Sequence, residues 1–233
     1  MALTEHACTQ PGAPVLIGEK AVARIPVMAV EEPLVDLAAI PGLRIDERMA
    51  EPTGRFRFVR EGLANRLAEA AAKLPAGLIF LVVEGYRSPA LQRQLFEEHL
   101  EELRDIHEPM PEEELLRLAS RFVAPPTGIP PHCSGAAVDL TLAQDGGPEL
   151  AMGTAVNEGP EASSQRCYSA SLDIPEHCRR NREILFGVLR AEGLVNYPTE
   201  WWHWSWGDRY WALQTGSPAA VYDLAEGFWE VEA

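Results

Sequence analysis

The order of apolar and polar positions predicts a chain in which helices and strands alternate. Apolar residues recur at helical spacing over 61–73, and an unbroken apolar run covers 78–83 after a turn that contains Pro75 and Gly77. These patterns predict a helix, a turn and a buried strand. Ser88 begins the next predicted helix, because serine is a favoured N-cap and the proline that follows it suits the first helical position.

Further elements are indicated in the second half of the chain. Residues 111–120 and 181–192 show helical spacing, and Gly193 supplies a stop signal for the second of these helices. Residues 136–142 predict a strand, which a proline-rich loop precedes. The Gly-, Glu- and Ser-rich stretch 144–164 predicts a long irregular excursion, of the kind that often forms a binding lid.

The N-terminal region predicts little regular structure. Residues 1–23 are rich in Pro, Gly and small side chains, and we expect them to form an irregular arm. Residues 24–30 and 34–37 have the composition of extended segments at an edge. We therefore expect one domain over 24–233, which follows the arm.

Composition and charge narrow the possible partners. The chain has 233 residues, 46% of them hydrophobic, which is enough for one sizeable core. It carries 20 Lys and Arg residues against 35 Asp and Glu residues, and the net charge of −15 repels nucleic acid and anionic membrane surfaces. The four cysteines form no CxxC pair, and the sequence shows neither a signal-peptide pattern nor a membrane-spanning apolar run. We therefore expect a cytoplasmic protein that binds neither nucleic acid nor membrane.

Two short stretches hold the groups that a single-zinc hydrolase needs. Zinc binds imidazole nitrogen and carboxylate oxygen, and a catalytic zinc site has three protein ligands and a fourth position for water. His132, Asp139 and His203 have the right chemistry for such ligands, and Glu200 lies three residues before His203. We predict one Zn²⁺ per chain, held by these three residues, with Glu200 as the general base.

A basic residue and a tryptophan-rich segment complete the predicted site. Arg87 lies between a strand and a helix, where clefts commonly open, so we predict that its guanidinium stabilises the developing oxyanion. The tryptophans within 201–206 favour a strand, so Glu200 must lie at a bend in order to face the same site as His203. The alternatives are hydrogen-bonded structural histidines and a structural salt bridge for Arg87. The remaining histidines are expected on the surface: His6, His99, His107 and His177.

These residues fall within longer motifs. The motifs are His132-x-x-Gly135-x-Ala137-x-Asp139, Glu200-x-Trp202-His203, Gly85-Tyr86-Arg87-Ser88-Pro89 and Met152-Gly153-Thr154. Together they resemble the zinc D-alanyl-D-alanine dipeptidases of the vancomycin-resistance type, within the D,D-carboxypeptidase and hedgehog-like fold group. The resemblance extends from about residue 24 to the C-terminus. It implies an α+β fold: a single domain with a central antiparallel sheet flanked by helices. It also implies the same roles for the residues named above, with His132, Asp139 and His203 as zinc ligands, Glu200 as the base and Arg87 at the scissile carbonyl.

Two departures from the family pattern bear on the substrate. Asn157 stands where the family has an aspartate thought to hold the substrate's ammonium group, and either Glu158 takes over this role or the substrate differs. Residues 46–54 lack an aromatic and an amide side chain that line the family's substrate site. The predicted substrate contacts are Ser134, Asn157, Glu158 and Trp202.

The predicted function is zinc-dependent hydrolysis of a short peptide, a D-Ala-D-Ala-type dipeptide, which is also the predicted partner. The oligomeric state is not predicted. Two alternatives stay open at this point. One is a D,D-carboxypeptidase or another peptidoglycan peptidase with a more open cleft. The other is a non-catalytic, metal-containing binding module, against which the presence of both Glu200 and Arg87 argues.

Overall fold

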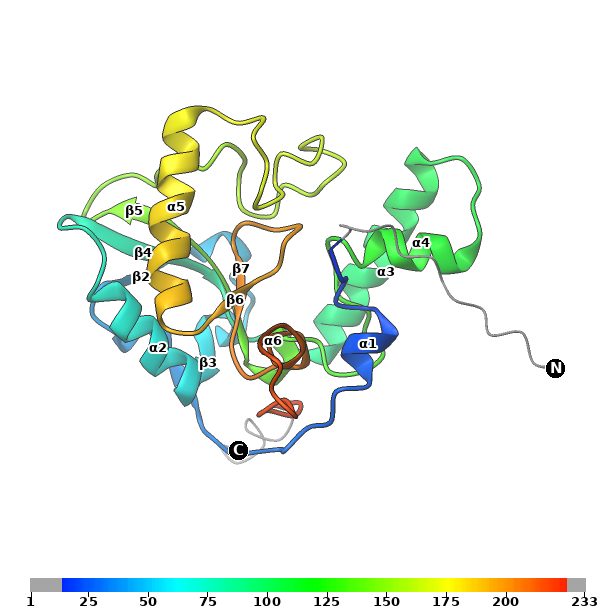
Figure 1. The fold of residues 1–233 in the computed structure, drawn as a ribbon, viewed down its shortest axis with the longest axis horizontal. Helices are drawn as coiled ribbons and strands as arrows, with labels where there is room; N and C mark the ends of the chain where they lie inside the picture. Colours follow the sequence, from blue (N-terminus) through cyan, green and yellow to red (C-terminus); the bar gives the residue numbers. More distant parts are fainter. Residues whose placement is uncertain (1–13, 226–233) are drawn as a thin grey trace.

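A computed structural model describes residues 14–225, and a five-stranded sheet forms its centre (Figure 1). The strand order is β2-β4-β5-β7-β6, and a separate small sheet pairs β1 with β3. The strands are β1 Leu34–Asp36, β2 Leu43–Ile45, β3 Phe58–Arg60, β4 Leu78–Glu84, β5 Ala137–Gln144, β6 Val195–Asn196 and β7 His203–Ser205.

The predicted α+β class is confirmed, with one correction to the sheet. Strands β4, β5, β7 and β6 pair in antiparallel fashion, but the edge strand β2 runs parallel to β4. Parallel strands need a long crossover connection. Here the chain between β2 and β4 is long enough to include the helix Glu61–Ala71, and this connection permits the parallel pair.

The helices lie in pairs in Figure 1, and α1 packs near α6. Helices α2 and α5 lie side by side against the sheet, whereas α3 and α4 lie together at the far end of the molecule. No helix within 14–225 is long and apolar enough to cross a membrane. The helices are α1 Lys20–Ala23, α2 Glu61–Ala71, α3 Pro89–Ile106, α4 Glu112–Ala119, α5 Glu176–Ala191 and α6 Arg209–Thr215; short 3-10 turns are η1 Leu37–Ala39, η2 Glu47–Met49, η3 Arg55–Arg57 and η4 His132–Ser134.

The main core lies between the sheet and helices α2 and α5. Leu67 of α2 and Leu189 of α5 are fully buried there, together with Leu140 and Leu142 of β5. Side chains alternate between the two faces of a strand, so a residue next to Leu140 points to the opposite face. Asp139 is that residue, and the core packing therefore directs its carboxylate away from α2 and α5.

Most of the predicted elements are present. Ser88 caps α3 as expected, because its hydroxyl accepts a hydrogen bond from the Leu91 amide, 3.2 Å away. Helix α5 begins earlier than predicted, at Glu176. The chain between β5 and α5 forms neither helix nor named strand, in agreement with the predicted excursion.

The N-terminal arm is less irregular than expected where the structure describes it. The short helix α1 lies within the predicted arm, and Leu16 and Val22 are buried against Tyr197 and Tyr210. These apolar contacts join the segment to the rest of the domain, a tertiary effect that local composition does not show. Residues 1–13 lie outside the described part of the chain.

The excursion is held to the domain by the buried side chain of Arg182. Its guanidinium donates hydrogen bonds to three backbone carbonyls of the excursion, those of Met152 at 2.7 Å, Tyr168 at 2.9 Å and Arg166 at 3.0 Å. It also lies over the ring of Trp201, with 5.3 Å between the Arg182 Cζ atom and the ring centroid. Burial lowers the pKa of Arg182 to about 10, which leaves it charged at neutral pH. One side chain thus supplies three of the hydrogen bonds that hold this segment to the domain.

We expect Arg182→Leu to lower the free energy of unfolding by about 3 kcal/mol, because one buried and two partly buried carbonyls lose their donors. Urea denaturation followed by circular dichroism measures this change. Arg180→Leu, on the same helix but with a side chain that is 66% exposed, is the matched control and should change stability by less than about 0.5 kcal/mol. Equal effects of the two substitutions would contradict the proposed role of Arg182.

Candidate active site

Strand register brings three polar residues into one row across the sheet. Asp139 of β5 pairs with His203 of β7 on one side and with Glu84 of β4 on the other. Directly opposite residues in antiparallel strands have side chains on the same face and close together. An irregularity in the β4–β5 pairing between Val82 and Glu84 brings Glu84 into this row. Such bulges commonly redirect a side chain beside a functional site.

His132 reaches the same row from the loop before β5. It begins the 3-10 turn η4, which ends at Gly135, where φ is 71°. Glycine suits this position for two reasons: the left-handed conformation is costly for other residues, and a Cβ atom here would lie 2.5 Å from Leu34 Cδ2. The turn therefore directs His132 back over the face that carries Asp139.

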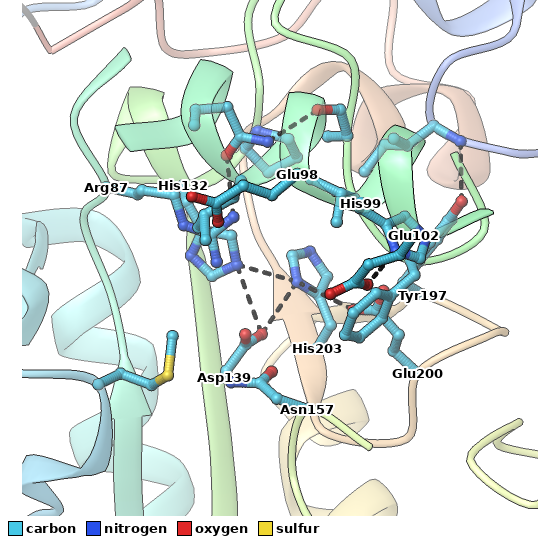
Figure 2. A pocket seen from close by; sticks show the side chains of 18 residues that line it. Arg87, Glu98, His99, Glu102, His132, Asp139, Asn157, Tyr197, Glu200 and His203 are labelled. Atoms are coloured by element: carbon cyan, nitrogen blue, oxygen red, sulfur yellow. Dashed lines mark hydrogen bonds and ion pairs between the residues drawn. The ribbon is translucent and has the colours of Figure 1, made fainter. Parts of the chain in front are cut away.

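The side chains of His132, Asp139 and His203 converge (Figure 2). His132 Nε2 lies 3.1 Å from His203 Nδ1 and 3.4 Å from Asp139 Oδ1, and His203 Nδ1 lies 3.0 Å from Asp139 Oδ1. Zinc ligands on bonds of about 2.0–2.1 Å at tetrahedral angles lie roughly 3.3 Å apart. The spacing of the three atoms therefore fits one zinc ion.

The tautomer of His132 also fits a metal ligand. Its Nδ1 lies 2.6 Å from the Gly85 carbonyl oxygen, which can only accept a hydrogen bond, so Nδ1 carries the proton. In the neutral ring, Nε2 then presents a lone pair toward Asp139 and His203. A backbone carbonyl that orients a ligating histidine in this way is a common feature of zinc sites.

The environment keeps the carboxylate of Asp139 ionised. Burial by itself would raise the pKa of Asp139, but the charges and hydrogen bonds of His132 and His203 outweigh burial and hold the pKa well below its usual range. Burial likewise acts to lower the pKa of His132, whereas the Asp139 carboxylate raises it, and the net shift is upward. The three side chains thus form a buried polar cluster with an ionised carboxylate, which suits a bound cation.

Glu200 lies beside this cluster but outside the set of three. Its Oε2 atom is 3.9 Å from His203 Nδ1, and its Oε1 atom is buried without a hydrogen-bond partner within the described part of the chain. The side-chain amide of Asn196 holds the turn, donating to the carbonyls of Glu200 and His203, each at 2.9 Å. This turn places Glu200 at the bend before β7, as predicted.

The pKa of Glu200 shifts in the opposite direction from that of Asp139. Burial raises it well above the usual value, the negative charge of Asp139 raises it further, and the positive charge of Arg87 opposes the shift. Two neighbouring carboxyl groups with opposite shifts are suited to different roles. Asp139 is suited to bind a cation as a carboxylate, and Glu200 is suited to take up and release a proton.

Arg87 lies at the end of the row, held by two side chains. Its Nε donates to Glu84 Oε1 at 2.7 Å, its Nη2 donates to Glu84 Oε2, and its Nη1 donates to Gln92 Oε1 at 3.0 Å. Burial would lower the pKa of Arg87, but the Glu84 carboxylate outweighs burial and raises it. A guanidinium has five N–H groups, so these contacts leave two for a ligand. Arg87 thus forms a buried salt bridge with Glu84, which is the alternative role that the sequence analysis considered. It also lines the site.

These groups line a cavity of about 210 Å³. Arg87, His132, Asp139, Glu200 and His203 all contribute to it. Most of the remaining walls come from one face of α3, from the segment after α4 and from Tyr197. Residues that line them include Ile17, Met49, Gln92, Leu95, Glu98, His99, Glu102 and Phe122.

Only one of the four predicted substrate contacts lines the cavity. Asn157 lines the cavity, and its φ of 64° is a left-handed conformation that asparagine tolerates better than most residues. Ser134 and Trp202 are fully buried and do not line it. Glu158 does not line it either, because its carboxylate accepts a hydrogen bond from the Ala155 amide at 3.0 Å. The positions of these last three residues therefore do not support direct contact with a substrate.

Helix α3 contributes residues that the sequence did not single out. Gln92, Glu98, His99 and Glu102 all face the cavity, and the prediction that His99 is exposed is wrong, since only 8% of it is accessible. Glu98 and His99 lie four and three positions before Glu102, and Gln92 lies seven positions before His99, so these residues share one helical face. That spacing was visible in the sequence, but an acidic helical face is more often simply solvated.

Comparison with known proteins agrees with this geometry. The family model Peptidase_M15, described as D-Ala-D-Ala dipeptidase, matches residues 45–219, more than half of the chain. A D-alanyl-D-alanine dipeptidase from a Synechocystis species is 29% identical over 217 residues, covering 82% of this chain and 88% of the relative. One from Escherichia coli is 38% identical over 72 residues, covering 31% of this chain and 35% of the relative.

Two solved structures are also similar. The LdcB LD-carboxypeptidase, described with its recognition of peptidoglycan, has a TM-score of 0.38 at 20% identity, over 80% of this chain and 74% of that chain. A mutant of the vancomycin-resistance D,D-pentapeptidase VanY, in complex with Zn(II), has a TM-score of 0.36 at 19% identity, over 87% of this chain and 96% of that chain.

The family match identifies the class of this protein, which is a metallopeptidase. The chain belongs to the Peptidase_M15 family of D-Ala-D-Ala dipeptidases.

We expect an excess of Zn²⁺ to raise the melting temperature of the metal-free protein by about 5–10 °C, because a ligand that binds only the folded state stabilises it. Asp139→Asn should abolish most of this increment, since it removes the charged ligand. Glu158→Gln, a charge change outside the cavity, is the control and should keep the increment. Differential scanning calorimetry measures all three, and an undiminished increment in Asp139→Asn would contradict the assigned ligand set.

Proposed function

We propose that the protein hydrolyses a free dipeptide of the D-Ala-D-Ala type, using one zinc ion held by His132, Asp139 and His203. The observation that carries this proposal is the convergence of two imidazole nitrogens and one ionised carboxylate, with Glu200 beside them and outside the ligand set. Membership of a dipeptidase family supports the same substrate class.

Each residue has a separate task in this reaction. A zinc ion, when bound, supplies Lewis-acid chemistry and makes water acidic near neutral pH. Glu200 accepts the proton of the attacking water, whose oxygen forms a bond to the peptide carbonyl carbon. The carbon–nitrogen bond then breaks, and Glu200 delivers the proton to the departing amine nitrogen. Glu200 must hold the proton between the two transfers, and its burial, which raises its pKa, favours this protonated form.

Arg87 stabilises the charge that develops on the carbonyl oxygen. Its two remaining N–H groups are available for this purpose, while Glu84 and Gln92 hold the guanidinium in place. The positive charge stays fixed before and during the reaction, so little reorganisation is needed as the oxyanion forms.

The dimensions of the cavity support a short substrate. Its volume is about 210 Å³, and Ile17 and Phe122 contribute apolar walls. The Ile17 amide donates to the Tyr197 hydroxyl at 3.2 Å, which holds the N-terminal segment against the cavity. A role in cell-wall metabolism and a cytoplasmic location remain predictions.

We expect Glu200→Ala to lower kcat by about 10²–10⁴-fold while zinc content stays near one ion per chain, because the base is lost and the ligands are kept. His203→Ala should lose both activity and zinc. Steady-state kinetics with metal analysis by mass spectrometry measures both properties. Glu176→Ala, whose side chain is 71% exposed, is the control. A zinc-loaded wild type without activity toward any D,D- or L,L-dipeptide would favour a binding module instead.

Substrate length separates a dipeptidase from a D,D-carboxypeptidase. We expect kcat/KM for free D-Ala-D-Ala to exceed that for a pentapeptide stem ending in D-Ala-D-Ala by more than about 100-fold, since a cavity of about 210 Å³ has little room for the additional residues. A panel that includes D-Ala-D-Ser and mixed-chirality dipeptides, with product amines quantified, measures this preference. Faster cleavage of the pentapeptide would make the carboxypeptidase the better assignment.

A further inference from the structure

The loop that carries His132 is held at three successive carbonyl groups, those of residues 133–135. The Ala225 amide donates to the first of them at 2.9 Å. Arg60 holds the other two, because its Nε atom donates to the second at 2.9 Å and its backbone amide donates to the third at 2.8 Å. A single residue outside the loop thus supplies two of the three hydrogen bonds that fix the backbone next to a proposed metal ligand.

Arg60 is itself fixed by its surroundings. It is the last residue of β3, and only 2% of it is exposed. Its Nη1 atom donates to the Glu32 carbonyl at 2.7 Å, and its Nη2 atom donates to the Asp223 carbonyl at 3.2 Å. The guanidinium also lies over the Tyr222 ring, with 5.3 Å between Cζ and the ring centroid. A planar guanidinium that is bonded at several donors has a defined orientation, so it can act as a rigid support for the loop.

The hydrogen-bond acceptor of the His132 ring is held by the same part of the chain. This acceptor is the Gly85 carbonyl, 2.6 Å from His132 Nδ1. The Gly85 amide in turn donates to the carbonyl of Phe56, which belongs to the turn η3 that leads directly into β3. The short segment 56–60 therefore holds the backbone beside His132 through Arg60, and it also holds the group that orients the ring.

The packing around the loop leaves little room for another conformation. A Cβ atom at Gly135 would lie 3.3 Å from Arg60 Cγ and 3.4 Å from the Arg60 amide nitrogen. The bond from Arg60 Nε to the Ser134 carbonyl is buried, and Ser134 itself is fully buried. A buried carbonyl that loses its donor is costly, so we expect the loop to move toward other donors or water once this bond is lost. Removal of the Arg60 side chain would also open space for such a movement.

A movement of this loop matters for metal binding because bonds to zinc are short and their geometry is narrow. His132 Nε2, the atom that faces Asp139 and His203, lies at the end of the ring, so a small rotation of the turn displaces it. Groups that orient a metal ligand without touching the metal contribute about 10–100-fold to metal affinity.

We propose that Arg60 is a positioning residue of the metal site, which holds His132 in its ligating orientation in the metal-free protein and thereby raises the affinity for zinc. This inference rests on the proposed function, because it concerns the metal that this function uses. Arg60 does not line the cavity, so its role involves no contact with the metal or the substrate.

Arg182 offers a comparison that separates positioning from general stability. It is as buried as Arg60, at 2% exposed, and its guanidinium also donates to three backbone carbonyls. All three carbonyls belong to the excursion between β5 and α5, and none belongs to the His132 loop. If Arg60 contributed only to stability, substitutions of the two arginines would have the same effect on metal binding.

The first test is therefore the zinc affinity of Arg60→Leu and Arg182→Leu, measured by competition with a chromophoric chelator. We expect Arg60→Leu to weaken zinc binding about tenfold, because His132 must be ordered when the metal binds. Arg182→Leu should change zinc affinity by less than about twofold, although both variants unfold at lower urea concentration than wild type. An unchanged affinity in Arg60→Leu, or equal losses in the two variants, would overturn the proposal.

Arg60→Lys keeps the test decisive if Arg60→Leu does not fold. Lysine retains the positive charge and most of the apolar stem, but it has no donor at the position of Nε. We expect a folded protein whose zinc affinity is weakened at least about threefold, with Arg182→Lys as the control that keeps the affinity of wild type. A folded Arg60→Lys with the zinc affinity of wild type would contradict the assigned role.

Proton NMR of the metal-free protein tests the orientation of His132 directly. A buried, hydrogen-bonded imidazole N–H exchanges slowly with water, so wild type should show a signal from His132 Nδ1–H, which His132→Gln assigns by its loss. Arg182→Leu should keep this signal, whereas Arg60→Leu should lose it because the loop is no longer held. Persistence of the signal in Arg60→Leu would count against the proposal.

These measurements separate the inference from the proposed function, because none of them uses the activity of the enzyme. Zinc binding without cleavage of any dipeptide would refute the proposed function, while the zinc affinities of the variants would still test the role of Arg60. A wild type that binds no zinc would refute both the metal site and its positioning residue. Unchanged zinc affinity in Arg60→Leu, in a protein that does cleave dipeptides, would refute only the role of Arg60.

Discussion

The alignment of β4, β5 and β7 is the constraint on which the site depends. It places Glu84, Asp139 and His203 in one row, so that the anchor of Arg87 and two proposed metal ligands are set by backbone pairing. A slip of one residue would turn Asp139 into the apolar core beneath the sheet and direct Leu140 into the cavity. The packing of Leu140 and Leu142 against α2 and α5 opposes such a slip. The energy that stabilises the core therefore also maintains the site.

The site also depends on polar side chains that are shielded from water and hydrogen-bonded to backbone carbonyls. The Gly85 carbonyl selects the tautomer of His132, and Asn196 holds the turn between Glu200 and His203. Burial would raise the pKa of both acids. The neighbouring histidines reverse this shift at Asp139, whereas the positive charge of Arg87 opposes it at Glu200 without reversing it. One environment thus produces an ionised carboxylate and a proton carrier a few ångströms apart.

Several features of the fold and site could be predicted from the sequence. Helix α3 with its Ser88 cap, the buried strand β4 and the excursion after β5 follow from local patterns that short-range physics determines. The parallel pairing of β2, the early start of α5 and the burial of α1 could not be predicted, because each depends on contacts between segments distant in sequence. His99 was misassigned for the same reason: its burial comes from Phe122, 23 positions later in the chain.

The sequence by itself determined the chemistry that is available: which side chains can bind zinc, which can carry a proton, and which family the motifs resemble. Only the tertiary structure decided which of these groups meet. It brought His132, Asp139, His203 and Glu200 together, left Ser134, Trp202 and Glu158 outside the cavity, and added one face of α3. The physical reason is that side-chain chemistry belongs to a single residue, whereas proximity, burial and pKa depend on neighbours that strand register and helix packing supply.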